Sequence, residues 1–268
     1  MLPRLFHLYG PLWVHSYGIM IALGFIVFLL LTLHHPKRKK LISTEGYLNT
    51  LFVGLLSGII GGRLLFVISE WEYYAQNMLE IFMPWEGGFI VLGSIIGVLI
   101  TVPAYLIYHK VQVLKLFDLA ALYAPIMQAI GRIGCLLAGC CHGKIAPNLP
   151  WSITFTNPES LAPCHLPLHP TQLYLMIASL GIFFILIGPA RLVAKKPGIM
   201  LCIYLMLESI ARFGIDYWRG DRGQLHSISI GKTITTTLSI PQLYSSVFFI
   251  FCIIALIILS FGKQNKDA

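Results

Sequence analysis

Residues 58–68 read GIIGGRLLFVI and place one arginine, Arg63, in the middle of an otherwise apolar stretch. A charged side chain at the centre of a lipid bilayer costs about 2.5–3.5 kcal/mol on insertion scales. Such residues are rare there, face the protein interior and mark functional sites. The stretch therefore predicts a chain that lies in a membrane and an interior site that attracts anions.

The same arrangement recurs further along the chain. Arg132 lies within QAIGRIGCLLAG, and Arg212 and Arg219 lie within LESIARFGIDYWR. The most common anion available to a membrane protein at this depth is a lipid phosphate. Guanidinium groups bind phosphate through two parallel hydrogen bonds. The arginines therefore predict a site for a phospholipid.

The composition is that of a membrane protein. Hydrophobic residues make up 57% of the 268 residues and charged residues 11%, whereas a soluble domain carries about 25% charged residues. A membrane-spanning helix needs about 20 apolar residues. Seven segments approach or exceed this length: 17–33, 47–69, 87–108, 117–139, 171–190, 198–218 and 241–261. We predict an all-α membrane protein with about seven transmembrane helices in a single domain, residues 1–268.

Basic residues predict the orientation of these helices. They cluster after the first, third, fifth and seventh segments, at 34–40, 109–115, 190–197 and in the C-terminal tail. By the positive-inside rule this side is cytoplasmic, so the N-terminus and the loop 140–170 lie outside and the C-terminus inside. The net charge of +8 then reflects topology and contact with anionic lipid, and nucleic acid is not an expected partner.

Glycines in the second and third segments predict close helix packing. Gly54, Gly58 and Gly62 repeat every four residues, and Gly93 and Gly97 repeat the pattern. Small residues at this spacing let two helix backbones approach each other in a membrane. We expect these glycines to serve packing.

The fourth segment is irregular. It contains Pro125, the polar Gln128 and Arg132, and the glycines Gly131 and Gly134. Non-helical backbone at membrane depth is tolerated where it lines a cavity or is buried in protein. We expect this segment to break near Arg132 and to form part of a site.

The loop 140–170 contains six prolines, and WSITF at 151–155 alternates like a short strand. A long ordered loop is either a passive cover or part of a functional site. Cys140 or Cys141 could form a disulfide with Cys164. A metal site with His142, His165 and His169 is conceivable, but the spacing matches no standard zinc pattern, and no metal is expected.

Four charged residues share one face of the sixth segment. Glu208, Arg212, Asp216 and Arg219 are spaced by four, four and three residues and fall within about 80° of one another on a helix. They could pair internally as a buried ion network. Alternatively, one or two arginines stay available for a phosphate, and Arg132 could converge on the same point.

These motifs resemble the prolipoprotein diacylglyceryl transferase family over nearly the whole chain. The joint match lies in the order and spacing of short motifs, each only moderately specific. They are HSYGIM at 15–20, GGRL at 61–64, LEIF with WEGG at 79–88, IGRIG at 130–134, PWSITF at 150–155, LHPTQLY at 168–174 and RFGIDYWR at 212–219.

The resemblance implies a multi-pass transferase of the bacterial inner membrane. Such enzymes move the diacylglyceryl group of phosphatidylglycerol to the lipobox cysteine in the signal peptide of a prolipoprotein, and they release glycerol 1-phosphate. The partners would be this lipid, that peptide and the membrane. No metal or organic cofactor is required by this chemistry.

The resemblance also assigns residues. Arg132 and Arg212 align with family-critical arginines and are predicted to stabilise the phosphate. Motif positions and local chemistry add further candidates. Predicted catalytic residues are Arg132, Arg212, Tyr17, His142 and His169. Predicted substrate-binding residues are Arg132, Arg212, Arg219, Arg63, Gly143 and Gln172.

The chain departs from the family pattern in two places. Leu92 stands where the family usually has a histidine, and Cys135, Ala138 and Cys140 replace polar positions after the IGRIG motif. Both changes affect the proton-transfer part of the site. Three side chains could supply a base instead, or could be structural: His142, His169 and Tyr17.

Two alternative functions remain compatible with the sequence. A divergent relative would keep the lipid site but use another thiol acceptor or another lipid, which the altered stretch 135–144 favours. A non-enzymatic phospholipid-binding or transport protein could also use intramembrane arginines. Release of glycerol phosphate separates enzyme from transporter, and a lipobox peptide as acceptor separates the first two functions.

Overall fold

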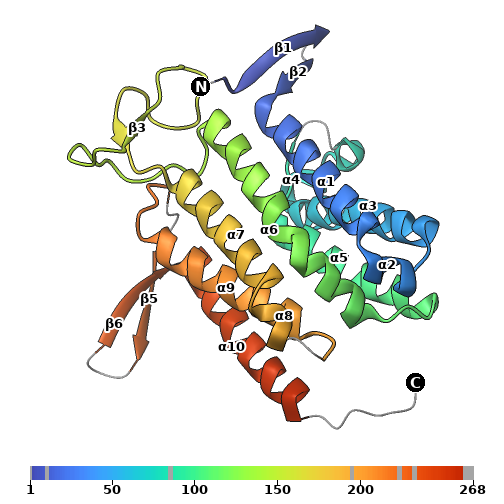
Figure 1. Ribbon diagram of the computed structural model, residues 1–268. Coiled ribbons are helices and arrows are strands. Elements are labelled where there is room, and N and C mark those ends of the chain that lie inside the picture. The colour runs from blue at the N-terminus through green and yellow to red at the C-terminus, as the bar shows by residue number, and fades with distance from the viewer. Residues whose placement is uncertain are drawn as a thin grey trace. The chain divides into compact units, whose positions relative to one another are not determined.

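The computed structural model describes residues 2–9, 12–83, 87–193, 196–221, 225–230 and 234–261 (Figure 1). The basic tail after residue 261 and part of the WEGG motif lie outside these ranges. The described chain is mostly helical and divides into two compact units, Met1–His34 with Phe117–Ala268, and His35–Leu116. Each unit is described separately below, and the single membrane domain stays a prediction.

A helix lies at each of the seven predicted segments. These are α1 (Ser16–His34), α3 (Thr44–Ser69), α5 (Val91–Tyr108), α6 (Val113–Ala138), α7 (Thr171–Ile187), α9 (Ile199–Asp216) and α10 (Ile240–Phe261). In the described ranges, four helices are long and apolar enough to cross a membrane: Ser16–His34, Thr44–Ser69, Val113–Ala138 and Ile240–Leu259. The helices α5 and α7 are apolar but shorter. The prediction of a helical membrane protein is confirmed at this level.

Short elements connect these helices. The helical turns are α2 (Pro36–Leu41), α4 (Trp71–Tyr74), η1 (Met78–Phe82) and α8 (Ala190–Val193). Three antiparallel strand pairs are β1 (Arg4–Tyr9) with β2 (Leu12–His15), β3 (Ile153–Thr154) with β4 (Pro167–Leu168), and β5 (Leu225–Ile230) with β6 (Ile234–Ser239). The strand predicted at 151–155 is found only at Ile153–Thr154, and the other two strand pairs were not predicted.

In the unit His35–Leu116, α3 and α5 pack with their backbones in contact. A Cβ atom added at Gly97 would lie 2.5 Å from the carbonyl oxygen of Ser57, and the same addition at Gly61 would meet the carbonyl of Gly93. Only glycine fits at such distances. The predicted close packing is confirmed at Gly93 and Gly97, whereas Gly54 and Gly58 make only ordinary van der Waals contacts. The partner of Gly93 is Gly61, which lies beside the predicted repeat.

Arg63 is buried in the same unit and holds the chain that follows α3. It donates hydrogen bonds to four backbone carbonyl oxygens, those of Glu80, Ile81, Gly87 and Gly88. Its guanidinium also lies over the rings of Phe66 and Tyr74, 5.9 and 5.3 Å from their centroids. The charge is therefore solvated by carbonyl dipoles and aromatic rings, which offsets the cost of burial.

In the other unit, α6 and α9 run parallel in a fixed register. Asp118 of α6 accepts hydrogen bonds from the backbone N–H groups of Gly198 and Leu201 at 2.7 and 2.8 Å. Ten residues further along α6, Gln128 donates a hydrogen bond to Glu208 of α9 at 3.3 Å. The contact of Asp118 with Gly198 and the contact of Gln128 with Glu208 each join residues 80 positions apart, so the two helices keep the same register over this length. The Asp118 carboxylate also satisfies free N–H groups at the start of α9, where negative charge is favourable.

An apolar core joins α6, α7 and α9, which Figure 1 shows side by side. The buried residues of this core come from all three helices and from α8: Ala121, Leu122, Ile182, Leu186, Ala190, Met200 and Tyr204. The helix α10 packs along α9. These contacts hold the polar face of α9 against α6.

The predicted break near Arg132 is wrong, because α6 is continuous through this position to its last residue. Pro125 lies inside the helix without ending it. Gly131 and Gly134 face α1, and a Cβ atom added at Gly134 would lie 2.9 Å from Cβ of Met20. The glycines therefore admit a neighbouring helix and do not unwind α6.

Replacing Arg63 with glutamine should destabilise the protein. The shorter side chain cannot reach all four carbonyl groups, and each buried carbonyl left unpaired costs about 1–3 kcal/mol. We expect a lower thermal unfolding midpoint for Arg63→Gln in detergent, followed by tryptophan fluorescence. Arg132→Gln is the matched control, because no hydrogen bond from Arg132 to a backbone carbonyl is found in the described chain. Equal midpoints for the two variants would contradict the role given to Arg63.

Candidate active site

Arg132 and Arg212 lie at the same level of two parallel helices. Each stands four residues beyond one member of the hydrogen bond between Gln128 and Glu208. Four residues advance a helix by about 6 Å and turn it by about 40°. The register of α6 and α9 therefore brings the two arginines onto neighbouring turns that face the same region.

One carboxylate, that of Glu208, lies between Gln128 of α6 and Arg212 of α9. Glu208 pairs with Nε of Arg212 at 2.6 Å, and its side chain is more deeply buried than that of Arg212. Arg132 is half-buried, and its guanidinium lies 4.0 Å from Sγ of Cys135. In the part of the chain that is described, Arg132 forms no ion pair with a carboxylate. The pair thus carries excess positive charge and can hold a further anion.

The turn after α6 is fixed by the start of α7. Gly139 ends α6 with a φ of 79°, as glycine commonly does after a helix. Thr171 Oγ1 then donates a hydrogen bond to the carbonyl oxygen of Cys141 at 2.6 Å, and Gln172 Nε2 donates one to that of Cys140 at 2.8 Å. Both α7 side chains are fully buried. Gln172, a predicted binding residue, therefore positions the turn that contains Cys140 and Cys141, called the cysteine segment below.

Gly143 joins the loop to the chain that follows α9. Its N–H donates a hydrogen bond to the carbonyl of His169 at 3.0 Å, and a Cβ atom added at Gly143 would overlap His169. The backbone N–H of Lys144 donates to the carbonyl of Trp218 at 2.8 Å, and Gly143 forms a bridge with Arg219. Glycine is thus required here by backbone contact, and its binding to substrate stays a prediction.

The ion network considered for the four charged residues of α9 forms only in part. Glu208 and Arg212 pair as expected. Arg219 lies just beyond the helix and binds Asp221 with two hydrogen bonds of 2.9 Å each. Asp216 accepts a hydrogen bond from Ser239 at 2.5 Å, at the junction of β6 and α10. Arg219 is therefore partly neutralised by Asp221, a residue that the sequence analysis did not single out.

The two histidines predicted to be catalytic, His142 and His169, lie in the loop 140–170. The Nδ1 atom of His142 is 3.1 Å from the carbonyl oxygen of Gly143, and Nδ1 of His169 is 3.3 Å from the hydroxyl of Tyr174. Tyr174 also accepts a hydrogen bond from the indole N–H of Trp151 at 2.9 Å. The sequence analysis gave neither Trp151 nor Tyr174 a role of its own. Both residues belong to quoted motifs, PWSITF and LHPTQLY, which is the signal that could have found them.

Tyr17 stands at the start of α1, against α6. A Cβ atom added at Gly134 would lie 3.4 Å from Cδ2 of its ring. The charge of Arg132 and the thiols of the cysteine segment act electrostatically on its hydroxyl. The structure thus brings Tyr17 into the neighbourhood of Arg132, and its catalytic role stays a prediction.

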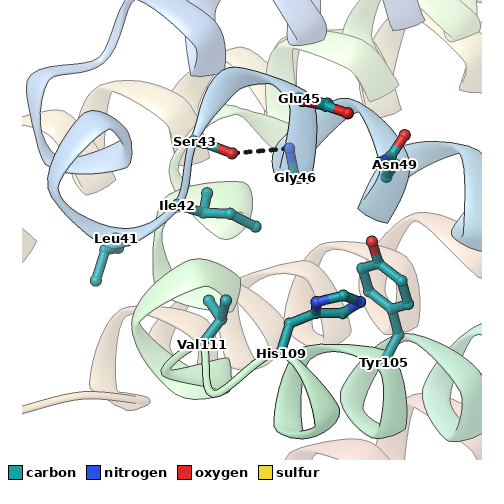
Figure 2. A pocket seen from close by; sticks show the side chains of 9 residues that line it. All are labelled: Leu41, Ile42, Ser43, Glu45, Gly46, Asn49, Tyr105, His109 and Val111. Atoms are coloured by element: carbon teal, nitrogen blue, oxygen red, sulfur yellow. Dashed lines mark hydrogen bonds between the residues drawn. The ribbon is translucent and has the colours of Figure 1, made fainter.

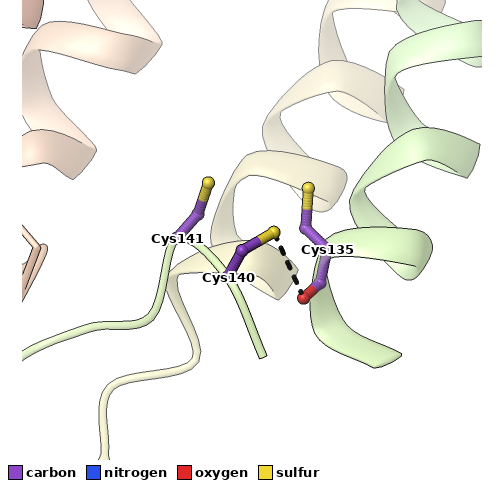
Figure 3. A group of neighbouring side chains, drawn as sticks. All are labelled: Cys135, Cys140 and Cys141. Atoms are coloured by element: carbon purple, nitrogen blue, oxygen red, sulfur yellow. Dashed lines mark hydrogen bonds between the residues drawn. The ribbon is translucent and has the colours of Figure 1, made fainter. Parts of the chain in front are cut away.

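Three cysteines gather beside Arg132. The Sγ atoms of Cys135, Cys140 and Cys141 all lie within 4.8 Å of one another (Figure 3). Hydrogen bonds from the Cys135 and Cys140 thiols lower the pKa of the Cys141 thiol below its ordinary value. All six cysteines are free thiols, and Cys164 donates to the carbonyl of Asn157 at 3.2 Å. The disulfide considered from the sequence is therefore not formed.

An apolar groove of about 440 Å³ lies between α9 and α10. It is lined on α9 by Ser209, Ile210, Phe213 and Gly214, and on α10 by Ser245, Ser246, Phe249 and Ile250. The α9 residues lie within three positions of Arg212 in sequence and face α10. The groove therefore offers apolar volume on a helix that also carries a cation of the site.

A second pocket, of about 410 Å³, lies in the unit His35–Leu116 (Figure 2). It lies between the start of α3, where Ser43 accepts a hydrogen bond from the N–H of Gly46 at 3.0 Å, and the end of α5 with Tyr105 and His109. No arginine lines it. Arg63 belongs to the same unit, but its contacts favour a structural role, and its binding to substrate stays a prediction.

Known proteins resemble this chain over most of its length. The family model described as prolipoprotein diacylglyceryl transferase matches residues 3–258. The phosphatidylglycerol–prolipoprotein diacylglyceryl transferase of Clostridium tetani is 36% identical over 236 residues, which are 88% of this chain and 92% of the relative. That of Clostridioides difficile is 35% identical, covering 94% and 92%. That of Dechloromonas aromatica is 31% identical, covering 96% and 94%. The chain belongs to the prolipoprotein diacylglyceryl transferase family.

Proposed function

We propose that this protein transfers the diacylglyceryl group of phosphatidylglycerol to the thiol of a lipobox cysteine in a prolipoprotein and releases glycerol 1-phosphate. The observation that carries the proposal is the excess positive charge at Arg132 and Arg212. Glu208 pairs with Arg212, whereas Arg132 forms no ion pair with a carboxylate in the described chain, and both arginines stand at one level of two parallel helices. A lipid phosphate supplies the missing negative charge.

The reaction needs cations beside the leaving phosphate. The acceptor thiolate attacks the glyceryl carbon, the bond from this carbon to the phosphate oxygen breaks, and its electron pair leaves with the phosphate. Negative charge therefore grows on the phosphate in the transition state. Fixed cations aimed at that charge lower the barrier, and in a water-poor site they act strongly. Arg132 and Arg212 perform this function in our proposal, and Arg219 contributes a weaker field because Asp221 pairs with it.

The groove between α9 and α10 receives an acyl chain of the lipid in our proposal. Its lining is mostly apolar, and the serines are small. A lipid whose phosphate lies at Arg212 has acyl chains that must enter apolar surroundings. Phe213 and Gly214 follow Arg212 in sequence but face α10, so an acyl chain of a lipid whose phosphate lies at Arg212 passes around α9 to reach this groove.

The membrane arrangement completes the proposal. All seven long helices cross the bacterial inner membrane, with the N-terminus outside and the C-terminus in the cytoplasm. This topology is supported by the helices found at the seven apolar segments and by the basic connections predicted to be cytoplasmic. The loop 140–170 then faces the side on which a signal peptide emerges from the membrane.

Replacing Arg132 or Arg212 with alanine should abolish most of the transfer activity. Loss of one donor to a developing oxyanion typically lowers kcat by about 10²–10³-fold. The assay uses the purified protein in detergent, phosphatidylglycerol and a lipobox peptide, with the peptide mass gain and glycerol 1-phosphate both measured. Arg4→Ala is the control, because Arg4 forms an exposed ion pair with Glu159.

The outcomes of this assay discriminate between functions. Full activity of both alanine variants would contradict the assignment of the arginines. A folded wild-type protein that binds the lipid but releases no glycerol 1-phosphate would contradict the transferase. Release that requires a thiol other than the lipobox cysteine would indicate the divergent acceptor.

A leucine at Gly214 should raise the KM for phosphatidylglycerol several-fold. The added side chain occupies the groove if an acyl chain binds there, whereas the arginines keep their positions. Gly181→Leu in α7 is the matched control, because at both glycines a Cβ atom meets nothing within 4 Å. An unchanged KM for Gly214→Leu, measured in mixed micelles of defined lipid content, would remove the groove from the binding site.

A further inference from the structure

The three thiols next to Arg132 have the geometry of a metal site. Cys135 belongs to the last turn of α6, and Cys140 and Cys141 belong to the turn that follows (Figure 3). Their sulfur atoms all lie within 4.8 Å of one another. Zn–S bonds of about 2.3 Å in a tetrahedral site place ligand sulfurs about 3.8 Å apart. Small side-chain rotations therefore suffice to bring the three sulfurs onto one ion.

The backbone of the cluster is held in place from outside. The carbonyl groups of Cys140 and Cys141 accept hydrogen bonds from the buried side chains of Gln172 and Thr171. Cys141 adopts a left-handed backbone with a φ of 57°, which is uncommon for a residue other than glycine. The surrounding contacts keep this turn, so the thiols are presented together before any ligand binds.

The charges near the cluster suit a metal bound by thiolates. Three thiolates and a divalent cation carry a net charge of −1. Arg132 lies within 4.0 Å of the sulfur of Cys135, and the charges of Arg132 and Arg219 also act on Cys141. Cations next to the ligands compensate the excess negative charge of such a centre.

We propose that Cys135, Cys140 and Cys141 bind one thiophilic divalent cation of the Zn²⁺ type, and that the fourth position of this ion takes the thiol of the acceptor cysteine. Thiolates select zinc and copper(I) over hard cations. Within the described ranges, the cluster contains no fourth histidine, cysteine or carboxylate. Three protein ligands with one open position are the pattern of zinc sites that bind a substrate. The ion site stands on its own, and only the use of its fourth position rests on the proposed function.

The ion gives the transfer reaction its nucleophile. The acceptor thiol releases its proton to water as it binds, because a thiol coordinated to Zn²⁺ is deprotonated. The sulfur electron pair then forms the bond to the glyceryl carbon, and the electron pair of the broken carbon–oxygen bond leaves with the phosphate. Arg132 lies beside both the cluster and the proposed phosphate position, so attack and departure take place at one point. The thioether product is neutral and leaves the ion.

Metal binding is tested on the full chain in detergent. The protein is freed of metal with a chelator under reducing conditions and titrated with Cd²⁺, which gives an ultraviolet thiolate-to-metal absorption. We expect one ion per chain in the wild type and in Cys164→Ser, whose loop thiol lies outside the cluster. Cys141→Ser and Cys140→Ser should bind at least about 100-fold more weakly, which is the upper range for losing even a second-shell partner.

Three results would overturn the site. They are the absence of saturable Cd²⁺ binding by the wild type, equal affinities of Cys141→Ser and Cys164→Ser, or a disulfide between two of the three cluster cysteines in protein purified without reductant. Because the wild type and Cys164→Ser are compared directly, misfolding of one cluster variant leaves the first and third tests intact. Zn²⁺ measured by elemental analysis provides an independent stoichiometry.

The fourth position is tested with Co²⁺, whose visible bands report the ligand set. Adding a lipobox peptide to the Co²⁺ protein should change these bands, whereas the same peptide with serine in place of cysteine should leave them unchanged. Identical spectra with both peptides would overturn the role of the fourth position, as would full transfer activity after the ion has been stripped. A protein that binds Cd²⁺ at the cluster but transfers no lipid would instead refute the proposed function and leave the ion site standing.

Discussion

The candidate site depends on the register between α6 and α9. The carboxylate of Asp118 binds the N–H groups at the start of α9, where a helix has no internal partners for them. This contact lies 14 residues before Arg132, about 21 Å along the helix. Gln128 and Glu208 repeat the same offset closer to the site. Two polar contacts inside apolar surroundings thus determine where both arginines stand, because a polar group placed out of register there would be left unsatisfied.

Glu208 sets the electrostatic character of the site. A second carboxylate facing Arg132 would neutralise the pair, and the removal of Glu208 would leave two cations close together without compensation. With one carboxylate for two guanidinium groups, the site stays positive while the helices remain packed. Arg219 follows a different pattern, since Asp221 takes two of its donors. The three arginines of the site therefore differ in how far a carboxylate neutralises them. Among them, Arg132 is the most available to an anion.

The helices were largely predictable, whereas the contacts of the site were not. Apolar length located all seven long helices to within a few residues, because a long apolar segment is expected to form a helix that satisfies its own backbone groups. The proline and glycines of α6 predicted a break near Arg132 that does not form. Gly134 reflects the approach of α1, which is a tertiary contact without a local signal. The partner of Arg219 and the clustering of Cys135 with Cys141 likewise arise from a turn geometry that sequence spacing does not specify.

Four arginines in similar apolar contexts serve different purposes, and the use of their donors separates them. The guanidinium of Arg63 donates hydrogen bonds to backbone carbonyl groups and lies over aromatic rings. Few of its donors are therefore left for a ligand. Arg132 is half-buried among thiols, with no carboxylate pair in the described chain. A buried arginine is therefore not in itself a sign of a binding site. The sign is a guanidinium whose charge the folded chain has left uncompensated, since only that group gains free energy from an incoming anion.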